Sequence, residues 1–133
     1  MRENELLSED LMMLASEVIY QTLGPIFNDQ VAPAPIPQGQ QIEGTYITYQ
    51  GISEDSLNTV KTWTGYDHLR VQINVFNTDK IQCEKDAARL KRAMSDQKLS
   101  ECVIAGAQDG GFDDETQLYQ HQVDIFIWQY AEE

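Results

Sequence analysis

The sequence predicts an α+β fold, a two-layer sandwich in which two helices cover one face of a mainly antiparallel four-stranded sheet. Three observations support this prediction. The chain has 133 residues, enough for one domain with a real core. Apolar residues keep helical spacing in two segments and alternate with polar ones in two others. The expected order is helix, strand, strand, helix, strand, strand, connected by hairpins rather than parallel crossovers.

The first helix is expected between Ser8 and Leu23. Ser8 can cap its N-terminus, and two acidic residues follow at the positive end of the helix dipole. Apolar residues then recur at helical spacing up to Leu23, and Gly24 followed by Pro25 supplies a stop. One face of this helix should therefore pack on a sheet.

The first two strands are separated by a long segment. Three prolines between residues 33 and 37 remove backbone donors, so we expect this stretch to be extended and outside any strand ladder. Strands are expected at about 44–52 and at 69–76, where apolar and polar residues alternate. Residues 53–68 are too long for a tight turn and are expected to form a projecting loop or hairpin arm of the single domain, residues 1–133.

The second half of the chain adds a helix and two strands. Asp79 can cap a helix that runs to about Met94. Residues 101–107 are a short apolar segment typical of a third strand, and a loop at 109–116 leads to the fourth strand at 118–130. The odd positions of that last strand, from Tyr119 to Ile127, are expected to face the core.

The even positions of the last strand become aromatic near its end. Phe126, Trp128 and Tyr130 would point away from the helices, together with Phe76 on a neighbouring strand. In one interpretation a loop or the proline segment folds over this apolar patch. In the other, the patch is a subunit interface, where Trp, Tyr and Phe are enriched.

The charge of the chain is strongly uneven. The net charge is −13 at pH 7, which argues against nucleic acid as a direct ligand. Six of the nine basic residues nevertheless fall between residues 80 and 98, so this segment carries +3 and the remainder −16. A solvated helix face explains most such runs. Alternatively, Lys85, Arg89 and Arg92 form one side of a salt-sensitive head-to-tail contact with acidic residues of the next subunit.

Common catalytic and cofactor motifs are missing from the sequence. The patterns GxSxG, GxxxxGK[ST], GxGxxG and HExxH do not occur, and neither His68 nor His121 has a sequence-level partner. We therefore expect no enzyme activity and no cofactor. Cys83 and Cys102 lack metal-binding spacing and are interpreted as small buried residues in a reducing compartment. The acidic N-terminus predicts neither a signal peptide nor a membrane span.

An acidic loop suggests calcium, which prefers carboxylate oxygens. Its acidic residues are Asp109, Asp113, Asp114 and Glu115. Their spacing does not match an EF-hand, and glycines stand where a further ligand would be needed, so a solvated turn is favoured and no metal site is predicted. Weak divalent binding shared between subunits remains open.

Three segments together resemble the tail-completion proteins of long-tailed bacteriophages, also described as tail-terminator or tail-to-head joining proteins. They are PxPxGxxxxxxYITYQ at 35–50, LRVQINVFNTD at 69–79 and VDIFIWQY at 123–130. The resemblance extends over residues 8–130 and rests on the order and spacing of segments rather than on one diagnostic motif.

The resemblance implies a non-catalytic ring, commonly a hexamer, in the neck of a virion. Its partners would be other copies of itself, the tail tube protein and the head connector or stopper protein, after a period in the host cytoplasm. DNA would pass through the lumen without specific binding, and acidic residues there would repel its phosphates. No membrane is involved. The alternative is an acidic DNA mimic that inhibits a host DNA-binding protein, although Lys85, Arg89 and Arg92 count against it.

Overall fold

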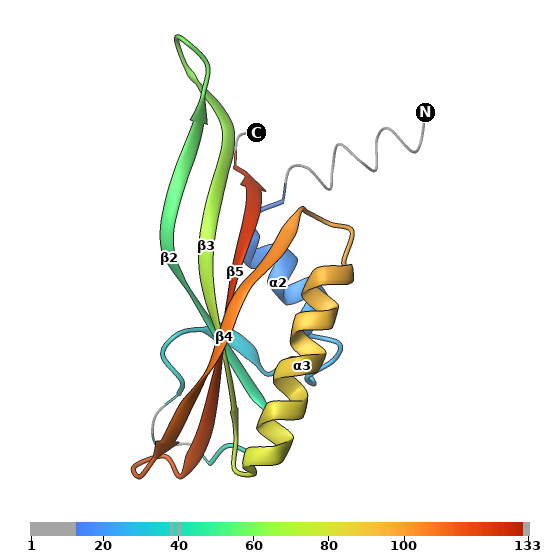
Figure 1. The fold of residues 1–133 in the computed structure, drawn as a ribbon, viewed down its shortest axis with the longest axis vertical. Helices are drawn as coiled ribbons and strands as arrows, with labels where there is room; N and C mark the ends of the chain where they lie inside the picture. The colour runs from blue at the N-terminus through green and yellow to red at the C-terminus, as the bar shows by residue number, and fades with distance from the viewer. Residues whose placement is uncertain (1–12, 38, 40, 132–133) are drawn as a thin grey trace.

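The computed structural model describes residues 13–37, 39 and 41–131. Within these residues, two helices pack on one face of a five-stranded sheet with strand order β1-β2-β3-β5-β4 (Figure 1). The helices are α2 (Ala15–Leu23) and α3 (Lys80–Asp96). The strands are β1 (Val31–Pro33), β2 (Tyr46–Asn58), β3 (Trp63–Asn77), β4 (Cys102–Asp113) and β5 (Leu118–Tyr130). The predicted α+β sandwich is therefore correct in its general form.

The sheet differs from the prediction in having a fifth strand and one parallel pairing. Residues 31–33 pair in parallel with residues 47–49 of β2, and the amide of Ala34 donates to the carbonyl of Tyr49 at 2.9 Å. The prediction that the proline segment lies outside every ladder is thus wrong at Pro33. A proline is tolerated there because β1 is an edge strand, on which a missing donor can face away from the sheet.

The core lies between the sheet and the two helices, and the predicted alternation places its residues. Odd-numbered residues from Gly65 to Asn77 in β3 and from Val123 to Ile127 in β5 are buried, whereas their even-numbered neighbours point to the opposite face. Tyr119 and His121, also predicted to face the core, are only partly buried. Burial of each such aliphatic side chain stabilises the fold by roughly 1.5–3 kcal/mol. The fully buried aliphatic core includes Val18, Ile19, Leu23, Ile73, Val75, Leu90, Val123, Ile125 and Ile127.

Helix α2 begins later than predicted. Its N-cap residue, Leu14, has extended backbone angles, and its amide donates to the carboxylate of Glu17 at 2.8 Å. A single continuous helix from Ser8 to Leu23 is therefore wrong, because the chain leaves helical geometry at Leu14. The predicted cap at Ser8 lies outside the described residues. Gly24 ends the helix as expected, and a Cβ there would come within 2.7 Å of the carbonyl oxygen of Tyr20.

Helix α3 follows the prediction closely. The Asp79 carboxylate accepts hydrogen bonds from the amides of Ile81 and Gln82 at 2.9 and 3.2 Å, which confirms the predicted cap. The apolar stripe of Cys83, Leu90 and Met94 is buried against the sheet.

The strands of both long hairpins are longer than the local sequence predicts. Strand β4 continues through Gly110 and Gly111 to Asp113, so the predicted loop at 109–116 is mostly strand, with a register shift between Asp109 and Gly111. Residues 53–68 form the distal parts of β2 and β3 and a short connection, and this hairpin arm projects beyond the rest of the sheet (Figure 1).

Candidate assembly surface

The sheet face opposite the helices carries an aromatic cluster, which we define as Tyr66, His68, Phe126, Trp128 and Tyr130. Strand register brings them together, because Tyr66 is paired with Tyr130, His68 with Trp128 and Arg70 with Phe126. The His68 ring stacks on Trp128 at 4.6 Å and on Phe126 at 5.4 Å between ring centroids. The ring centroids of Tyr66 and Tyr130 are 4.6 Å apart. Phe126 remains 36% exposed, so part of this apolar surface faces solvent.

Phe76 does not join this cluster. It pairs with Gln120 on β5 and Tyr46 on β2, six positions along β3 from the partner of Phe126, a separation of about 20 Å along the strand. Phe76 instead lines a hollow with Ala34, Pro35 and Ile36, where the neighbouring Thr48 and Asn74 are buried. The proline segment therefore lies beside Phe76, whereas the other three predicted aromatics lie in the aromatic cluster.

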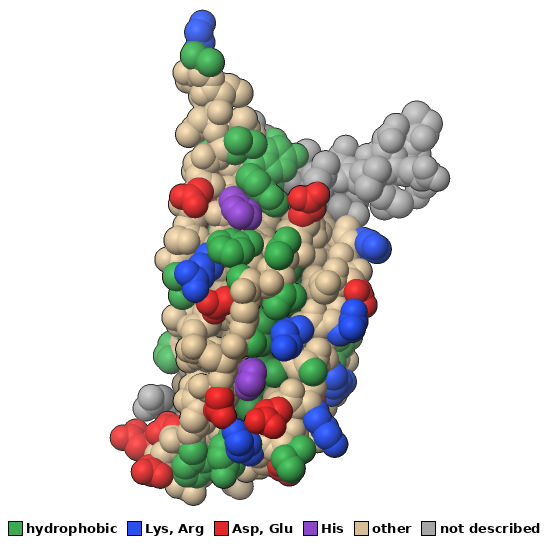
Figure 2. All heavy atoms as spheres, viewed as in Figure 1, with side chains coloured by type: hydrophobic (Ala, Val, Ile, Leu, Met, Phe, Trp, Pro, Cys, Tyr) green, Lys and Arg blue, Asp and Glu red, His purple; other side chains and the backbone are tan. Residues whose placement is uncertain are grey.

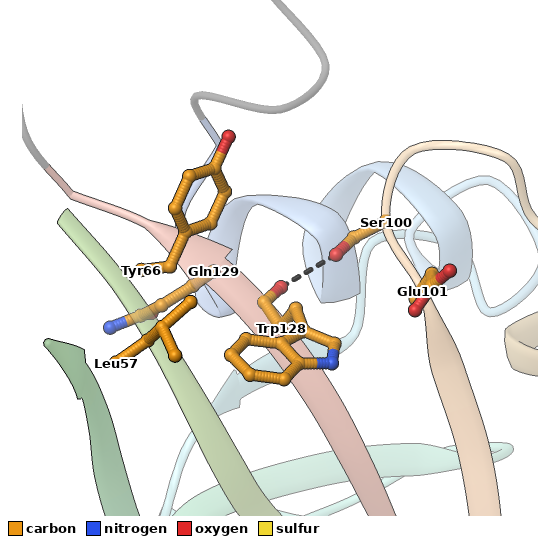
Figure 3. A pocket seen from close by; sticks show the side chains of 6 residues that line it. All are labelled: Leu57, Tyr66, Ser100, Glu101, Trp128 and Gln129. Atoms are coloured by element: carbon orange, nitrogen blue, oxygen red, sulfur yellow. Dashed lines mark hydrogen bonds between the residues drawn. The ribbon is translucent and has the colours of Figure 1, made fainter. Parts of the chain in front are cut away.

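A pocket of about 310 Å³ opens beside the aromatic cluster, at the Tyr66–Tyr130 pair where the hairpin extends beyond the end of β5, a point that we call the base of the arm (Figure 3). It is lined by Leu57, Tyr66, Ser100, Glu101, Trp128 and Gln129. The Trp128 amide donates to the Glu101 carbonyl at 3.2 Å, and the Ser100 hydroxyl donates to the Trp128 carbonyl at 2.5 Å. These hydrogen bonds fix the backbone of Trp128, so its indole is held in place as an apolar wall of the pocket.

The middle of the same sheet face is polar rather than aromatic. Side-chain amides bond across strands between Gln50 and Gln72 at 3.3 Å and between Gln108 and Gln122 at 2.7 Å. Arg70 pairs with Asp124 at 2.6 Å. This polar band lies between the aromatic cluster and Phe76. The charges of Arg70 and Asp124 within it neutralise each other.

A buried carboxylate fastens the hairpin arm to the body. Asp67 is 3% exposed and accepts hydrogen bonds from Ser56 at 2.7 Å and from the Trp63 indole at 3.1 Å. Gln129 reaches the same carboxylate at 3.5 Å and accepts from the amide of Ala15 at 3.1 Å. Two strands of the arm, β5 and the start of α2 are thus connected through one acidic side chain, which makes the arm a defined structure rather than a free loop.

The three predicted basic residues lie on α3 but differ in their contacts. Lys85 and Arg92 are exposed, and Figure 2 shows positive side chains gathered over this helix. Arg89 is already engaged within the chain, because it pairs with the buried Asp86 at 2.9 Å and lies 5.3 Å from the centroid of the Phe27 ring. Lys85 and Arg92 are therefore more available than Arg89 to a second molecule.

The predicted acidic residues do not converge on one point. Asp109 pairs with Lys80 of α3 at 2.5 Å, and this partner holds the pKa of the Asp109 carboxyl below its ordinary value. Asp113 accepts from the amide of Glu115 at 3.2 Å and the hydroxyl of Thr116 at 3.0 Å, which closes the turn. Among the described residues, no group of three or more His, Cys, Asp or Glu side chains is arranged to hold a metal ion.

Both cysteines are free thiols, one buried and one partly buried. Burial raises the pKa of Cys83 and that of Cys102 to about 11, so neither is a reactive thiolate near neutral pH. No described helix has the length and apolar character needed to span a bilayer.

Sequence reasoning missed two members of the aromatic cluster, His68 and Tyr66. The sequence indicated no partner for His68. The only available signal was the alternation along residues 66–76, which places both residues on the same face as Phe76. Their contact with Trp128 and Tyr130 depends on how β3 and β5 align, which no local pattern reports.

No protein-family model matches this sequence, and no curated protein sequence does. One solved structure with a similar fold is described as the virion of a native gene transfer agent particle. A chain of that virion superposes with a TM-score of 0.56 and 14% sequence identity, over 85% of this chain and 92% of the other. At this identity the likeness establishes a shared fold across nearly the whole of both chains.

Proposed function

We propose that this chain is a structural protein of a phage-like virion and assembles into a ring, in the form of a hexamer, that ends the tail tube and joins it to the head connector. The observation that carries the proposal is the aromatic cluster on the sheet face opposite the helices, where four rings are partly exposed and Phe126 is 36% exposed. Exposed aromatic side chains of this kind mark protein contact surfaces. The fold shared with a virion chain supports the same assignment.

The contacts of the ring are head-to-tail, with one surface of a subunit meeting a different surface of the next. Phe126, Trp128 and Tyr130 supply the apolar contact, with Phe76 and the adjoining proline segment at its far end. Lys85 and Arg92 of α3 supply a basic contact for acidic residues of the next subunit. Arg89 has a smaller part in this contact, because it already pairs with Asp86 of its own chain. The acidic turn at Asp113, Asp114 and Glu115 is available as the opposing surface (Figure 2).

The role is structural rather than catalytic, and the acidity of the chain suits it. A ring on the DNA path must let the genome slide, and carboxylates near the lumen repel phosphates over roughly one Debye length, about 8 Å at physiological salt. Each copy carries a net charge of −13, and in the proposed ring part of this acidity faces the channel. No membrane or cofactor takes part in this role.

The DNA-mimic alternative has less support from the charges. Mimicry needs free carboxylates along one continuous face, but Asp86, Asp109 and Asp124 are each paired with a basic side chain of the same molecule. The helix with the greatest concentration of basic residues also lies on the surface. Capture of a host DNA-binding enzyme by the isolated protein would favour the mimic.

The test is native mass spectrometry over a concentration series, with and without millimolar divalent cation, followed by negative-stain imaging alone and with purified tail tubes. A closed hexamer with a central hole, placed at one end of each tube, is expected. A protein that stays monomeric or dimeric in every condition and leaves the tube ends bare would contradict the proposal.

A further inference from the structure

The tip of the hairpin arm is a preorganised turn that presents one apolar and one cationic side chain. The amide of Thr59 donates to the carbonyl of Thr62 at 2.7 Å, and the Thr59 hydroxyl bonds to the amide and carbonyl of Thr62. Between them, Val60 is fully exposed and Lys61 is exposed. Because the turn is already closed, docking of this tip would cost little conformational entropy.

The pocket at the base of the arm has complementary chemistry. Leu57, Tyr66 and Trp128 give it apolar walls, and Glu101 places a carboxylate at its margin (Figure 3). Its volume of 310 Å³ lies at the lower end of the range, roughly 300–1,000 Å³, typical of sites that enclose a small group. An apolar side chain followed by a cation is therefore a suitable occupant.

The tip of one molecule is directed away from the pocket of the same molecule. Leu57 and Tyr66 stand on the two strands of the arm, and the turn at 59–62 continues past them to the far end of the hairpin (Figure 1). Within the described residues the arm is a paired β-hairpin as far as Asn58 and Trp63, so it does not fold back on its own base. The tip is therefore free for an intermolecular contact.

We infer that the arm tip of one copy docks in the pocket of the next copy, with Val60 against Trp128 and Leu57, and with Lys61 paired to Glu101. The inference rests on the proposed self-assembly and names the contact that performs it. Each copy then gives one tip and receives one, which is the heterologous arrangement that closes into a ring when the rotation between copies permits. It also explains why an apolar pocket adjoins the arm.

A charge exchange tests the pairing directly. Lys61→Glu and Glu101→Lys should each weaken self-association at least tenfold, because each places like charges together, and the double variant should restore it. Lys98→Glu is a matched control, since it makes the same charge change at another exposed lysine. Native mass spectrometry over a concentration series measures association, and thermal melts verify that each variant folds. Single variants that associate like the wild type, or a double variant without recovery, would overturn the inference.

A second measurement identifies the contact without relying on affinity. A photoreactive benzophenone amino acid replaces Val60, and this protein is mixed with isotopically heavy wild-type protein before irradiation. Cross-linked peptides are expected to join residue 60 of the light copy to the peptide containing Glu101 or Trp128 of the heavy copy. Cross-links only within one copy, only to another surface, or none at the highest concentration would overturn it.

The two measurements also separate this inference from the proposed function. If the wild type caps tail tubes as a ring while the Lys61 and Glu101 variants assemble unchanged, the ring stands and the arm contact is wrong. If the tip cross-links to the pocket but the product is an open filament that never caps tubes, the arm contact stands and the tail-terminator assignment is wrong.

Discussion

The imidazole of His68 stacks on the indole of Trp128, with 4.6 Å between ring centroids and 28° between ring planes. The two residues belong to different strands and are directly opposite each other in the β3–β5 register. A cross-strand aromatic pair of this kind stabilises the sheet by roughly 0.2–1 kcal/mol. It also keeps the indole in one orientation, so Trp128 can present a rigid surface to a partner at little entropic cost.

Replacing Trp128 by Ala should weaken the assembled ring without unfolding the subunit. Central interface aromatics cost about 2 kcal/mol or more when truncated, which corresponds to an approximately thirtyfold loss of affinity. Trp128 is only partly exposed, so much of its side chain already packs within the chain and a fall of a few degrees in Tm is also expected. Trp128→Phe, which keeps an aromatic ring, is the control. A variant that loses its cooperative melt would instead identify Trp128 as a core residue.

Replacing Asp67 by Ala should loosen the hairpin arm and leave the body folded. The substitution removes the acceptor for Ser56 and for the Trp63 indole, and unsatisfied polar groups of this kind cost about 1–3 kcal/mol. Hydrogen exchange should therefore accelerate at amides of residues 57–66 but not in α3. Asp55→Ala, on the exposed face of the same hairpin, is the matched control. Equal protection of the arm in both variants would show that Asp67 does not fasten it.

The parts of the fold that local patterns determine were predictable from the sequence. Asp79 caps α3 because its carboxylate reaches amides two and three positions further on, and such a contact can be read from spacing alone. Alternation along 69–76 likewise identified Val71, Ile73 and Val75 as core residues. Both signals depend only on neighbours in the chain.

The errors arose where distant segments decide the structure. Pro33 is in a strand because β2 lies beside it, and β4 continues through two glycines because β5 provides a partner. Leu14 interrupts the predicted helix where Met13 and Ala15 bond to β5 residues instead, through the amide of Tyr130 at 3.1 Å and the Gln129 side chain. His68 joined the candidate site for the same reason, since its ring partners are on another strand.

The core of α3 gives a direct test of the packing. Leu90 is fully buried, so Leu90→Ala should reduce the free energy of unfolding by about 2–5 kcal/mol through lost burial and a residual cavity. Ile81 lies on the same helix but is 64% exposed, so Ile81→Ala should change the free energy of unfolding by about 0.5 kcal/mol or less. Urea denaturation of both variants measures the difference. Similar losses in the two would mean that the helix faces the sheet differently.

The buried thiols predict a decline in stability at alkaline pH. Burial raises the pKa of Cys83 from its ordinary value of 9.0 to about 11, so the folded protein holds this proton more tightly than the unfolded chain. The stabilisation of the folded state by the protonated Cys83 thiol is fully present below pH 9 and is lost as pH rises from 9 towards 11. Urea unfolding of the wild type and of Cys83→Ala at pH 7, 9 and 10.5 should show a shallower decline in the variant. Parallel curves would exclude the thiol as the cause.

The surface of α3 predicts assembly that depends on salt. Lys85 and Arg92 are exposed, so Lys85→Glu combined with Arg92→Glu should weaken ring formation at low salt while leaving Tm within a few degrees of wild type. Raising the salt concentration should reduce the difference between variant and wild type, because screening removes the attraction that the variant lacks. Sedimentation velocity at about 50 and 500 mM salt measures both effects.

Arg89 on the same helix should behave differently and serves as the comparison. Its partner Asp86 is almost fully buried and also bonds to Thr45 and to Gln82, the latter at 3.0 Å, so Arg89→Glu places a second negative charge beside a buried carboxylate. The expected result is a loss of about 1–3 kcal/mol in folding stability, visible in the monomer. Two outcomes would contradict the assignment of Lys85 and Arg92 to a subunit contact and of Arg89 to the stability of the fold. They are a loss of assembly alone in Arg89→Glu, and a loss of Tm alone in the Lys85 and Arg92 double variant.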